Sequence, residues 1–408
     1  MLKKRYCAAL LAAVGLVTAA CASSGGTGGG ADGSKSPINL MVDTTMSPAA
    51  SFGGLSYPFP YTAALAAAAA INKNGGIDGH PLRINVCDNE GDPNQSAACG
   101  RQAISQHDIA VIGSWDPHGA AYILPVLQAA KIPYVGATAS TPAELSNPMS
   151  FTFDTGAPLD QLMSGKLWAD IGCKQVVYFA INTGAAAGQQ VAMVEKAAQQ
   201  AGVKVDTVDV SIGQADVSAP MSTALSDHPD CMSYLYDGKT AVKLIAAARQ
   251  DGFTGKFTAL VGSLTPSFLA TLGSAGNGVI AVSTTLTPDS NDPLVKEFVS
   301  QVTAYTGASQ AGATLNEFGQ DGWSSVQLIK QALTGASEYT SAELLKKLPT
   351  MCDVNVGNVY PDVDFCKPAV GSTVYTRVFN PYVRYYIAEN GKYVPYDDQW
   401  HDGSSVMS

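Results

Sequence analysis

Short apolar segments alternate with alanine-rich segments along most of this chain, and this alternation constrains the fold more than any other feature. Near-continuous apolar strands are typical of a parallel sheet that helices cover on both faces. The pattern therefore predicts the α/β class. In the first third, strands are expected at 38–42, 82–86, 109–113 and 133–136, and helices at 61–76, after the N-cap Asp92, and up to Leu127.

The alternation starts again after Phe153, and with 408 residues the chain is long enough for two cores. We therefore predict two doubly wound parallel-sheet lobes. The second series has strands at 175–181, 203–212, 232–237, 257–262 and 279–284, and helices near 158–170, 186–201, 239–250 and 265–272. Two later helices, 293–305 and 317–333, precede a terminal antiparallel hairpin at 377–394 that turns at Asn390-Gly391.

The N-terminus has the pattern of a lipoprotein signal peptide. Basic residues 3–5 precede the apolar run 8–20, which is too short to span a bilayer, and the run ends in Thr18-Ala19-Ala20-Cys21. We expect residues 1–21 to be the signal, lipidation at Cys21, and a flexible Ser/Gly tether at 22–36. The alternative is an ordinary secretory signal with an incidental cysteine. Either way the protein is expected outside the cytoplasm, and lipidation would hold it at the outer face of the cell membrane.

Six cysteines follow Cys21, and an even number in an exported chain indicates disulfides. Several pairings are possible. Local spacing favours Cys87 with Cys99 and Cys352 with Cys366, which leaves Cys173 with Cys231. Zinc is the competing interpretation, but the sequence has no CxxC motif and its histidines are scattered, so we expect no metal and no cofactor.

Charge and motifs argue against several function classes. The formal net charge of −10, without a basic stripe, argues against nucleic acid as a partner. No GxSxG, HExxH or complete phosphate-loop motif is present. Residues 237–240 end like a phosphate loop, but Ser233 stands where its first glycine is required. The chain is therefore not expected to be an enzyme.

In open parallel sheets, ligands bind beyond the carboxyl ends of the strands, so the residues that follow each strand are the candidates for a site. Aromatic and polar side chains in these segments can contact a small molecule, although for each of them ordinary packing or helix capping is an equal alternative. These candidates are Tyr57, Trp115, Asp116, His118 and Asp237, together with Phe318 and Gln320 at the start of the 317–333 helix.

Two segments carry a resemblance to a known family. INKNGGIDGHPLRINVCDNEGDPNQSAACGRQA (71–103) and VIGSWDPHGAAYILPVLQAAKIPYVGATASTPAEL (111–145) resemble the type I periplasmic binding proteins, exemplified by the leucine/isoleucine/valine-binding protein. The resemblance implies a monomer with two lobes that close on a solute and deliver it to the permease subunits of an ABC importer. It places crossovers near 154–158, near 284–288 and after Leu333. The first lobe would be 37–155 with 287–335, and the second 157–284 with 336–408.

The resemblance also implies site residues, and here the sequence departs from the family. The Ala-Thr pair of the ligand loop falls on Ala137 and Thr138, whereas the acid that receives an ammonium in the second lobe would fall near Gly262-Ser263, where there is none. We therefore expect a neutral or anionic small organic solute (amino-acid-like, an amide or an aromatic acid) rather than a branched-chain amino acid. A ligand-sensing module that reports to a membrane receptor is the alternative function.

Overall fold

The computed structural model describes residues 35–181, 184–357 and 362–407, and the following sections concern this part of the chain. The predicted signal peptide, the lipidation site Cys21 and most of the expected tether lie outside the described residues.

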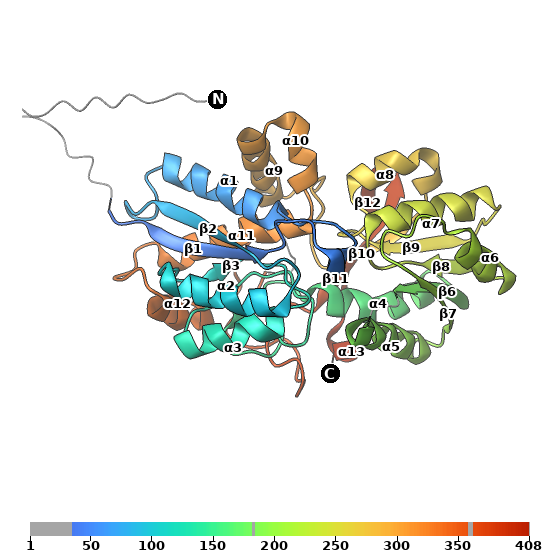
Figure 1. Ribbon diagram of the computed structural model, residues 1–408, viewed down its shortest axis with the longest axis horizontal. Helices are drawn as coiled ribbons and strands as arrows, with labels where there is room; N and C mark the ends of the chain where they lie inside the picture. The colour runs from blue at the N-terminus through green and yellow to red at the C-terminus, as the bar shows by residue number, and fades with distance from the viewer. Residues whose placement is uncertain (1–34, 182–183, 358–361, 408) are drawn as a thin grey trace, which may run out of the picture. The chain divides into compact units, whose positions relative to one another are not determined.

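The first sheet is fully parallel and has the strand order β2-β1-β3-β4-β5. Its strands are β1 (Ile38–Thr44), β2 (Leu82–Asp88), β3 (Val111–Ile112), β4 (Tyr134–Val135) and β5 (Ser150–Phe151). Because the chain moves outward from β1 in both directions, helices cover both faces of the sheet. The helices of one face are α1 (Phe59–Lys73), α9 (Pro293–Thr306) and α11 (Glu317–Leu333), and those of the other are α2 (Pro93–Ser105) and α3 (Ala120–Ala130) (Figure 1).

Small residues bring α1 and α11 close together. Five alanines of α1 are buried in the core under the sheet, where their short side chains leave room for the second helix. A Cβ on Gly322 of α11 would lie 2.2 Å from the carbonyl oxygen of Pro60, so only glycine permits this contact. On the opposite face, α2 begins as predicted, with Pro93 in the first position and the Asp92 carboxylate accepting from the backbone N–H groups of Asn94 and Gln95.

The second sheet is parallel except for its last hairpin, in the order β12-β11-β10-β9-β8-β6-β7. Its strands are β6 (Gln175–Ile181), β7 (Lys204–Val210), β8 (Cys231–Ser233), β9 (Lys256–Leu260), β10 (Ile280–Ser283), β11 (Tyr382–Glu389) and β12 (Lys392–Asp402). One face carries α4 (Gly156–Asp170) and α5 (Gly184–Gln200), and the other carries α6 (Ser218–Ser226), α7 (Gly238–Gln250) and α8 (Pro266–Leu272) (Figure 1). Two doubly wound α/β lobes are thus confirmed.

The predicted terminal hairpin forms, and its turn has the expected chemistry. Asn390 and Gly391 connect β11 to β12 with φ of 52° and 79°. Two consecutive positive φ values define the tight hairpin turn that Asn-Gly favours.

Several short elements were not predicted. They are β5, α6, α10 (Ala308–Thr314), α12 (Ser341–Lys347), α13 (Ser404–Met407), and the single 3-10 turns η1 (Ala50–Phe52), η2 (Gly273–Gly276) and η3 (Leu348–Thr350). Each is too short to show a clear hydrophobic period.

The segment that follows α11 differs from the expected lobe assignment. Residues 336–408 were expected with the second lobe, but Leu344, Leu348 and Phe365 are buried in the core of the first sheet. The chain joins the second sheet only at β11, so its third passage between the lobes lies near residue 380 rather than directly after Leu333. The cause is α12, which Thr340 caps and whose leucines pack beside α11.

The three favoured disulfide pairs are confirmed. Cys87 is bonded to Cys99, Cys173 to Cys231 and Cys352 to Cys366. The first joins β2 to α2 and the second joins the turn before β6 to β8, so each ties a strand to a neighbouring element. Within the described segments, no helix is both long and apolar enough to cross a membrane.

Candidate ligand-binding cleft

Five rings from three separate segments form an aromatic cluster at the carboxyl end of the first sheet. The cluster consists of Phe52, Tyr57, Trp115, His118 and Phe318. Trp115 lies at its centre, with its ring centroid 4.0 Å from Tyr57, 5.0 Å from Phe52 and 5.2 Å from Phe318. Phe52 is buried, His118 is exposed and the other three are half-buried. The structure thus brings together four predicted site residues with Phe52, which lies in the same loop as Tyr57.

Asp116 lies behind this cluster and is almost completely buried. Its carboxylate accepts from the backbone N–H of Gly119 at 2.8 Å, which holds the loop before α3. Asp43, at the end of β1, is buried beside it; burial first, and then the charge of Asp116, raise the pKa of Asp43 well above its ordinary value. Two neighbouring buried carboxyls cannot both ionise cheaply, so they make this part of the first lobe a poor place for another negative charge.

Two other predicted residues of the first lobe are engaged in its interior. Thr138 is buried beside Ala137, and its hydroxyl donates to the Asp321 carboxylate. Gln320 is fully buried, and its Nε2 donates to the backbone carbonyl of Gly357 at 3.1 Å. These side chains hold α11 against the loop after β4 and against the segment before residue 358.

Asp237 is a predicted residue of the second lobe whose charge acts on Tyr57 of the aromatic cluster. Its carboxylate accepts from the Thr240 backbone N–H at 2.8 Å, which caps α7, and from the Tyr234 hydroxyl at 2.6 Å. Burial, and then the charge of Asp237, raise the pKa of Tyr57, because the two groups approach each other. Tyr57 follows β1 and Asp237 follows β8, so the strand ends of the two sheets meet here.

The two lobes also come close to each other at two glycines. A Cβ on Gly53 would lie 3.0 Å from Cγ2 of Ile212, and a Cβ on Gly262 would lie 2.3 Å from Oε2 of Glu317. Gly53 and Glu317 belong to the first lobe, whereas Ile212 and Gly262 follow strands of the second. The structure therefore shows a cleft between the lobes in a closed form.

Glu317 is the functional candidate that the sequence reasoning missed. It is 7% exposed, and burial first, and then the charge of Asp154, raise its pKa to about 8. No acid was expected near Gly262-Ser263, but Glu317 reaches Gly262 from the first lobe, and Gly238, which follows Asp237, approaches the Ser263 carbonyl. The signal was visible: the helix was predicted to begin at 317, beside the candidate Phe318.

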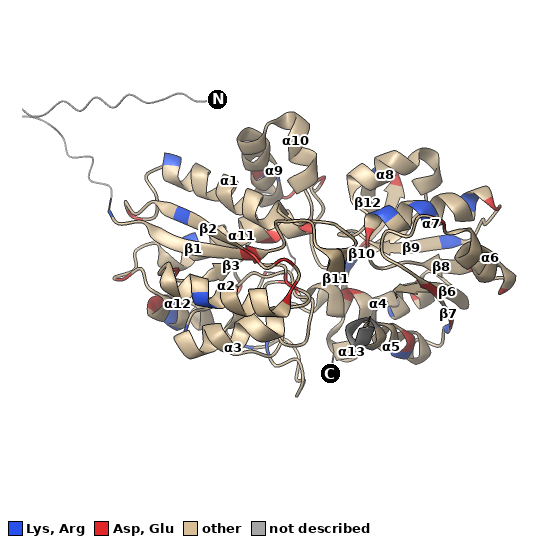
Figure 2. Cartoon of the chain, viewed as in Figure 1, with Lys and Arg blue, Asp and Glu red and all other residues tan. Residues whose placement is uncertain are grey.

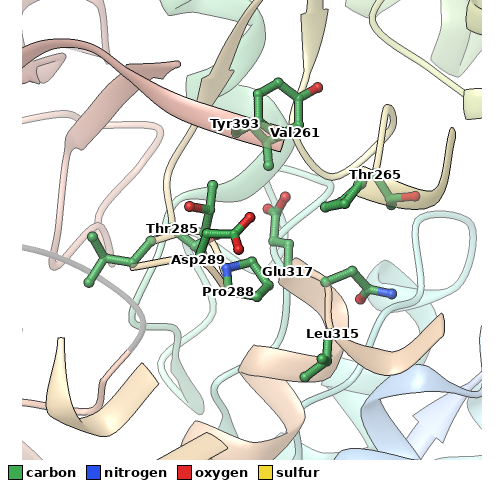
Figure 3. A pocket seen from close by; sticks show the side chains of 12 residues that line it. Val261, Thr265, Thr285, Pro288, Asp289, Leu315, Glu317 and Tyr393 are labelled. Carbon is green, nitrogen blue, oxygen red and sulfur yellow. The ribbon is translucent and has the colours of Figure 1, made fainter. Parts of the chain in front are cut away.

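The Glu317 carboxylate projects into a narrow pocket beside this contact (Figure 3). The pocket has room for no more than about one water molecule in this closed form. The second lobe, the crossover after β10 and the turn before α11 all contribute to its lining, which is Val261, Thr265, Pro266, Thr285, Leu286, Thr287, Pro288, Asp289, Leu315, Asn316, Glu317 and Tyr393.

Two more carboxyls are buried where the chain passes between the lobes. Asp154 lies in the first crossover, and the Thr284 hydroxyl of the second crossover donates to it at 3.3 Å. Burial raises the pKa of Asp154 to about 7. Asp160 of α4 is 2% exposed, and burial, then the charge of Glu317, raise its pKa well above the ordinary value. A group of three acids thus surrounds the hinge.

The described residues offer two groups with the composition of a metal site. They are Cys173, Asp230 and Cys231, and Cys352, Asp364 and Cys366. In both groups the two cysteines are bonded to each other, so their thiolates are not available as ligands.

Comparisons with known proteins agree with this architecture. No curated protein sequence matches the chain. Among solved structures, a leucine-binding protein from Thermotoga maritima is 17% identical, with a TM-score of 0.71 over 90% of this chain and 99% of that one. A solute-binding protein of an ABC transporter from R. palustris, in complex with 4-hydroxybenzoate, is 17% identical, with a TM-score of 0.71 over 91% and 98%. A fatty acid ABC transporter substrate-binding protein from Thermomonospora curvata is 15% identical, with a TM-score of 0.71 over 91% and 93%.

At these identities, the likeness to solved structures shows the fold alone. The model of one sequence family, described as periplasmic binding protein, matches residues 47–368. This match covers β2 to β10 and most of the segments that form the cleft, and with it the chain belongs to the periplasmic binding protein family.

Proposed function

We propose that this protein is the lipid-anchored solute-binding component of an ABC importer, which captures a small organic solute between its two lobes. Members of its family are extracytoplasmic proteins that bind solutes without transforming them. Solved structures of the same fold include proteins for amino acids, benzoates and fatty acids of ABC transporters.

The meeting of the two sheets' strand ends supports this function most directly. Tyr57 faces Asp237, Gly53 approaches Ile212, and Glu317 approaches Gly262. A solute that touches both sides of this junction stabilises the closed form by its contacts with the second lobe. Occupancy is thereby converted into a change of shape that a membrane partner can recognise.

The aromatic cluster supports a small organic solute rather than an inorganic ion. Half-buried Tyr57, Trp115 and Phe318 offer apolar ring faces with polar edges at the place where loops of parallel sheets bind ligands. Amino-acid-like compounds, amides and aromatic compounds have the size and apolar surface that such rings accept. The remaining candidates, Asp116, Ala137, Thr138 and Gln320, act in this proposal as the support of the aromatic cluster.

A lipid at Cys21 would hold the protein beside its permease. The same chain without a permease would be suited to the alternative, a sensor that reports occupancy to a receptor. Crosslinking of the anchored protein in intact cells separates the two, because an importer component is captured with permease subunits and a sensor with a receptor.

Thermal unfolding across a panel of small organic solutes tests the binding function. A solute that binds only the folded protein raises the midpoint by mass action. Calorimetry then measures its affinity for the wild type, for Trp115→Ala and for the control Tyr122→Ala, whose ring is 53% exposed on α3. We expect Trp115→Ala to weaken binding at least about tenfold and Tyr122→Ala to leave it unchanged. Full affinity in Trp115→Ala would remove the aromatic cluster from the site.

A further inference from the structure

We propose that the cleft selects a small organic cation without a carboxylate, with Glu317 as the counter-ion of its positive group. The inference rests on the proposed solute-binding function and narrows its solute class. It also replaces the expectation of a neutral or anionic ligand, which depended on the absence of an acid near Gly262.

The first support is a buried acid that faces the pocket without a base. The Glu317 side chain points into the space beneath Thr265 and Val261, and no residue lining this space is Lys or Arg (Figure 3). The second carboxylate of the lining, Asp289, is exposed and pairs with Lys392 at 3.2 Å, so the exposed lysine compensates that acid and not Glu317. Among the pocket's carboxylates, Glu317 is the one for which the structure shows no cationic partner.

The second support is the surroundings of Glu317, which add negative rather than positive charge. Asp154 and Asp160 are its acidic neighbours, and each has one carboxyl oxygen that is buried without a hydrogen-bond partner. In the free protein, a hydrogen bond from the Thr284 side chain lowers the pKa of Glu317, but burial and Asp154 outweigh it, so protonation is the available compensation for the buried charge. A ligand that carries a positive charge into this group would compensate it directly.

The third support is the position of the aromatic cluster relative to this acid. Glu317 and Phe318 are adjacent in the first turn of α11. The proposed counter-ion and one ring of the aromatic cluster therefore belong to the same helix turn. Phe318 lies 5.7 Å from Tyr57 and 5.2 Å from Trp115 between ring centroids. Faces of Tyr, Trp and Phe attract cations, and the attraction grows when water is excluded.

A carboxylate on the ligand, by contrast, finds Lys or Arg in only one of the segments that follow the strands, where Lys239 is exposed in the first turn of α7. The segments 46–59, 114–119, 137–142 and 262–266 contain no Lys or Arg. The Thr138 hydroxyl already donates to Asp321, and buried Asp43 and Asp116 lie behind the ring of Trp115. Figure 2 shows Asp and Glu near the α11 label, and Lys and Arg along α7 of the second lobe.

Two matched series of probes test the charge preference. The aromatic series is phenethylamine, phenethyl alcohol, hydrocinnamate and phenylalanine; the aliphatic series is isoamylamine, isoamyl alcohol, isocaproate and leucine. Each series holds the apolar body constant and varies the charged groups. We expect an amine to raise the unfolding midpoint of the full-length protein most, and to bind at least about tenfold more tightly than its alcohol, acid and amino-acid counterparts.

The variant Glu317→Gln keeps the shape of the side chain and removes its charge. We expect it to weaken amine binding at least about thirtyfold while binding of the matched alcohol stays unchanged. Glu297→Gln makes the same substitution at an exposed site on α9 and should change neither. Equal loss of amine and alcohol binding in Glu317→Gln would indicate a structural defect and would refute the counter-ion role.

Proton release provides a readout that a structural role would not produce. Because Glu317 has a raised pKa of about 8, a bound cation must displace its proton at neutral pH. The other titratable groups near this acid are Asp154, Asp160, Asp289 and Tyr393. Calorimetry in buffers of different ionisation enthalpy should show release of about one proton per amine in the wild type and almost none in Glu317→Gln.

The outcomes separate this inference from the function on which it rests. Tightest binding of an alcohol, an acid or an amino acid, or amine binding without proton release, overturns the cation inference and leaves the solute-binding function standing. If none of the eight probes and no member of the wider solute panel stabilises the protein, both are refuted.

Discussion

Replacing Glu317 with glutamine should make the protein less sensitive to alkaline pH. The folded pKa of this group, about 8, lies above its ordinary value of 4.5, so the folded protein retains a proton that the unfolded chain has lost. The contribution of Glu317 is therefore fully present below about pH 4.5 and is lost as the pH rises through about 8. The free energy of unfolding falls in this window by about 1.4 kcal/mol per pH unit for one group.

The structure also limits the size of the effect. The difference between the two pKa values sets an upper bound of about 5 kcal/mol. Opening of the lobes hydrates Glu317 without unfolding the protein, and open and closed forms of such binders differ by only a few kcal/mol. We therefore expect about 2 to 3 kcal/mol. In the variant, Asp154 and Asp160 lose a negative neighbour. This change also makes the variant less sensitive to alkaline pH than the wild type.

Urea unfolding at several pH values between about pH 5 and about pH 9 measures this effect. The free energy of unfolding of Glu317→Gln minus that of the wild type should increase by the expected amount over this range. Glu297→Gln, on the exposed face of α9, controls for the substitution itself and should follow the wild type. A difference between Glu317→Gln and the wild type that is the same at every pH would show that this carboxyl is not buried, and the reasoning would fail.

Three further outcomes are expected. Replacing Cys173 and Cys231 with alanine removes a bond that spans 58 residues and should lower the free energy of unfolding by about 4 kcal/mol, measured by urea unfolding under non-reducing conditions. Gly262→Ala places a Cβ against the Glu317 carboxylate and should shift the free protein toward the open form, seen as a larger radius of gyration in X-ray scattering than for an alanine control at the glycine of α10. Cys21→Ala should release the protein from membranes and abolish incorporation of labelled palmitate; incorporation that persists in the variant would refute the lipid site.

Local chemistry explains why the framework could be predicted from the sequence. Residues 175–181 and 317–333 were predicted with the bounds that the structure has, because the first is a continuous apolar strand and the second is a long helix with a clear period. The cap at Asp92 and the turn at Asn390 likewise depend on residues that are adjacent in the chain. Such features need no knowledge of the rest of the fold.

The region after Leu333 could not be assigned because it depends on distant contacts. The Thr340-Ser-Ala-Glu343 pattern that starts α12 is a capping signal, but seven residues give no reliable period. Whether Leu344 packs with the first or the second core is decided by the position of α11, which lies earlier in the chain. Sequence distance therefore misled the lobe assignment.

The cleft was predictable only in part for the same reason. Trp115 and Phe318 could be selected one by one, because each lies beside a predicted strand or helix end, but their meeting 5.2 Å apart depends on how α11 returns to the first sheet. Acidic residues are ordinarily exposed, so there was no reason in the sequence to expect burial of Asp154, Asp160 or Glu317, even though Glu317 begins a predicted helix. These three residues come from different parts of the chain and meet only in the folded structure.

The two sides of the closed cleft differ in what they can offer a solute. The first lobe provides ring faces and the carboxylate of Glu317, which has no Lys or Arg in the pocket lining. The second lobe provides Asp237, whose oxygens already accept from Thr240 and Tyr234, and the glycine backbone at Gly262. Under the proposed function, chemical selection therefore falls mainly to the first lobe, because its groups gain most from a ligand. The second lobe then contributes chiefly by excluding water, which strengthens the attraction between Glu317 and a bound charge.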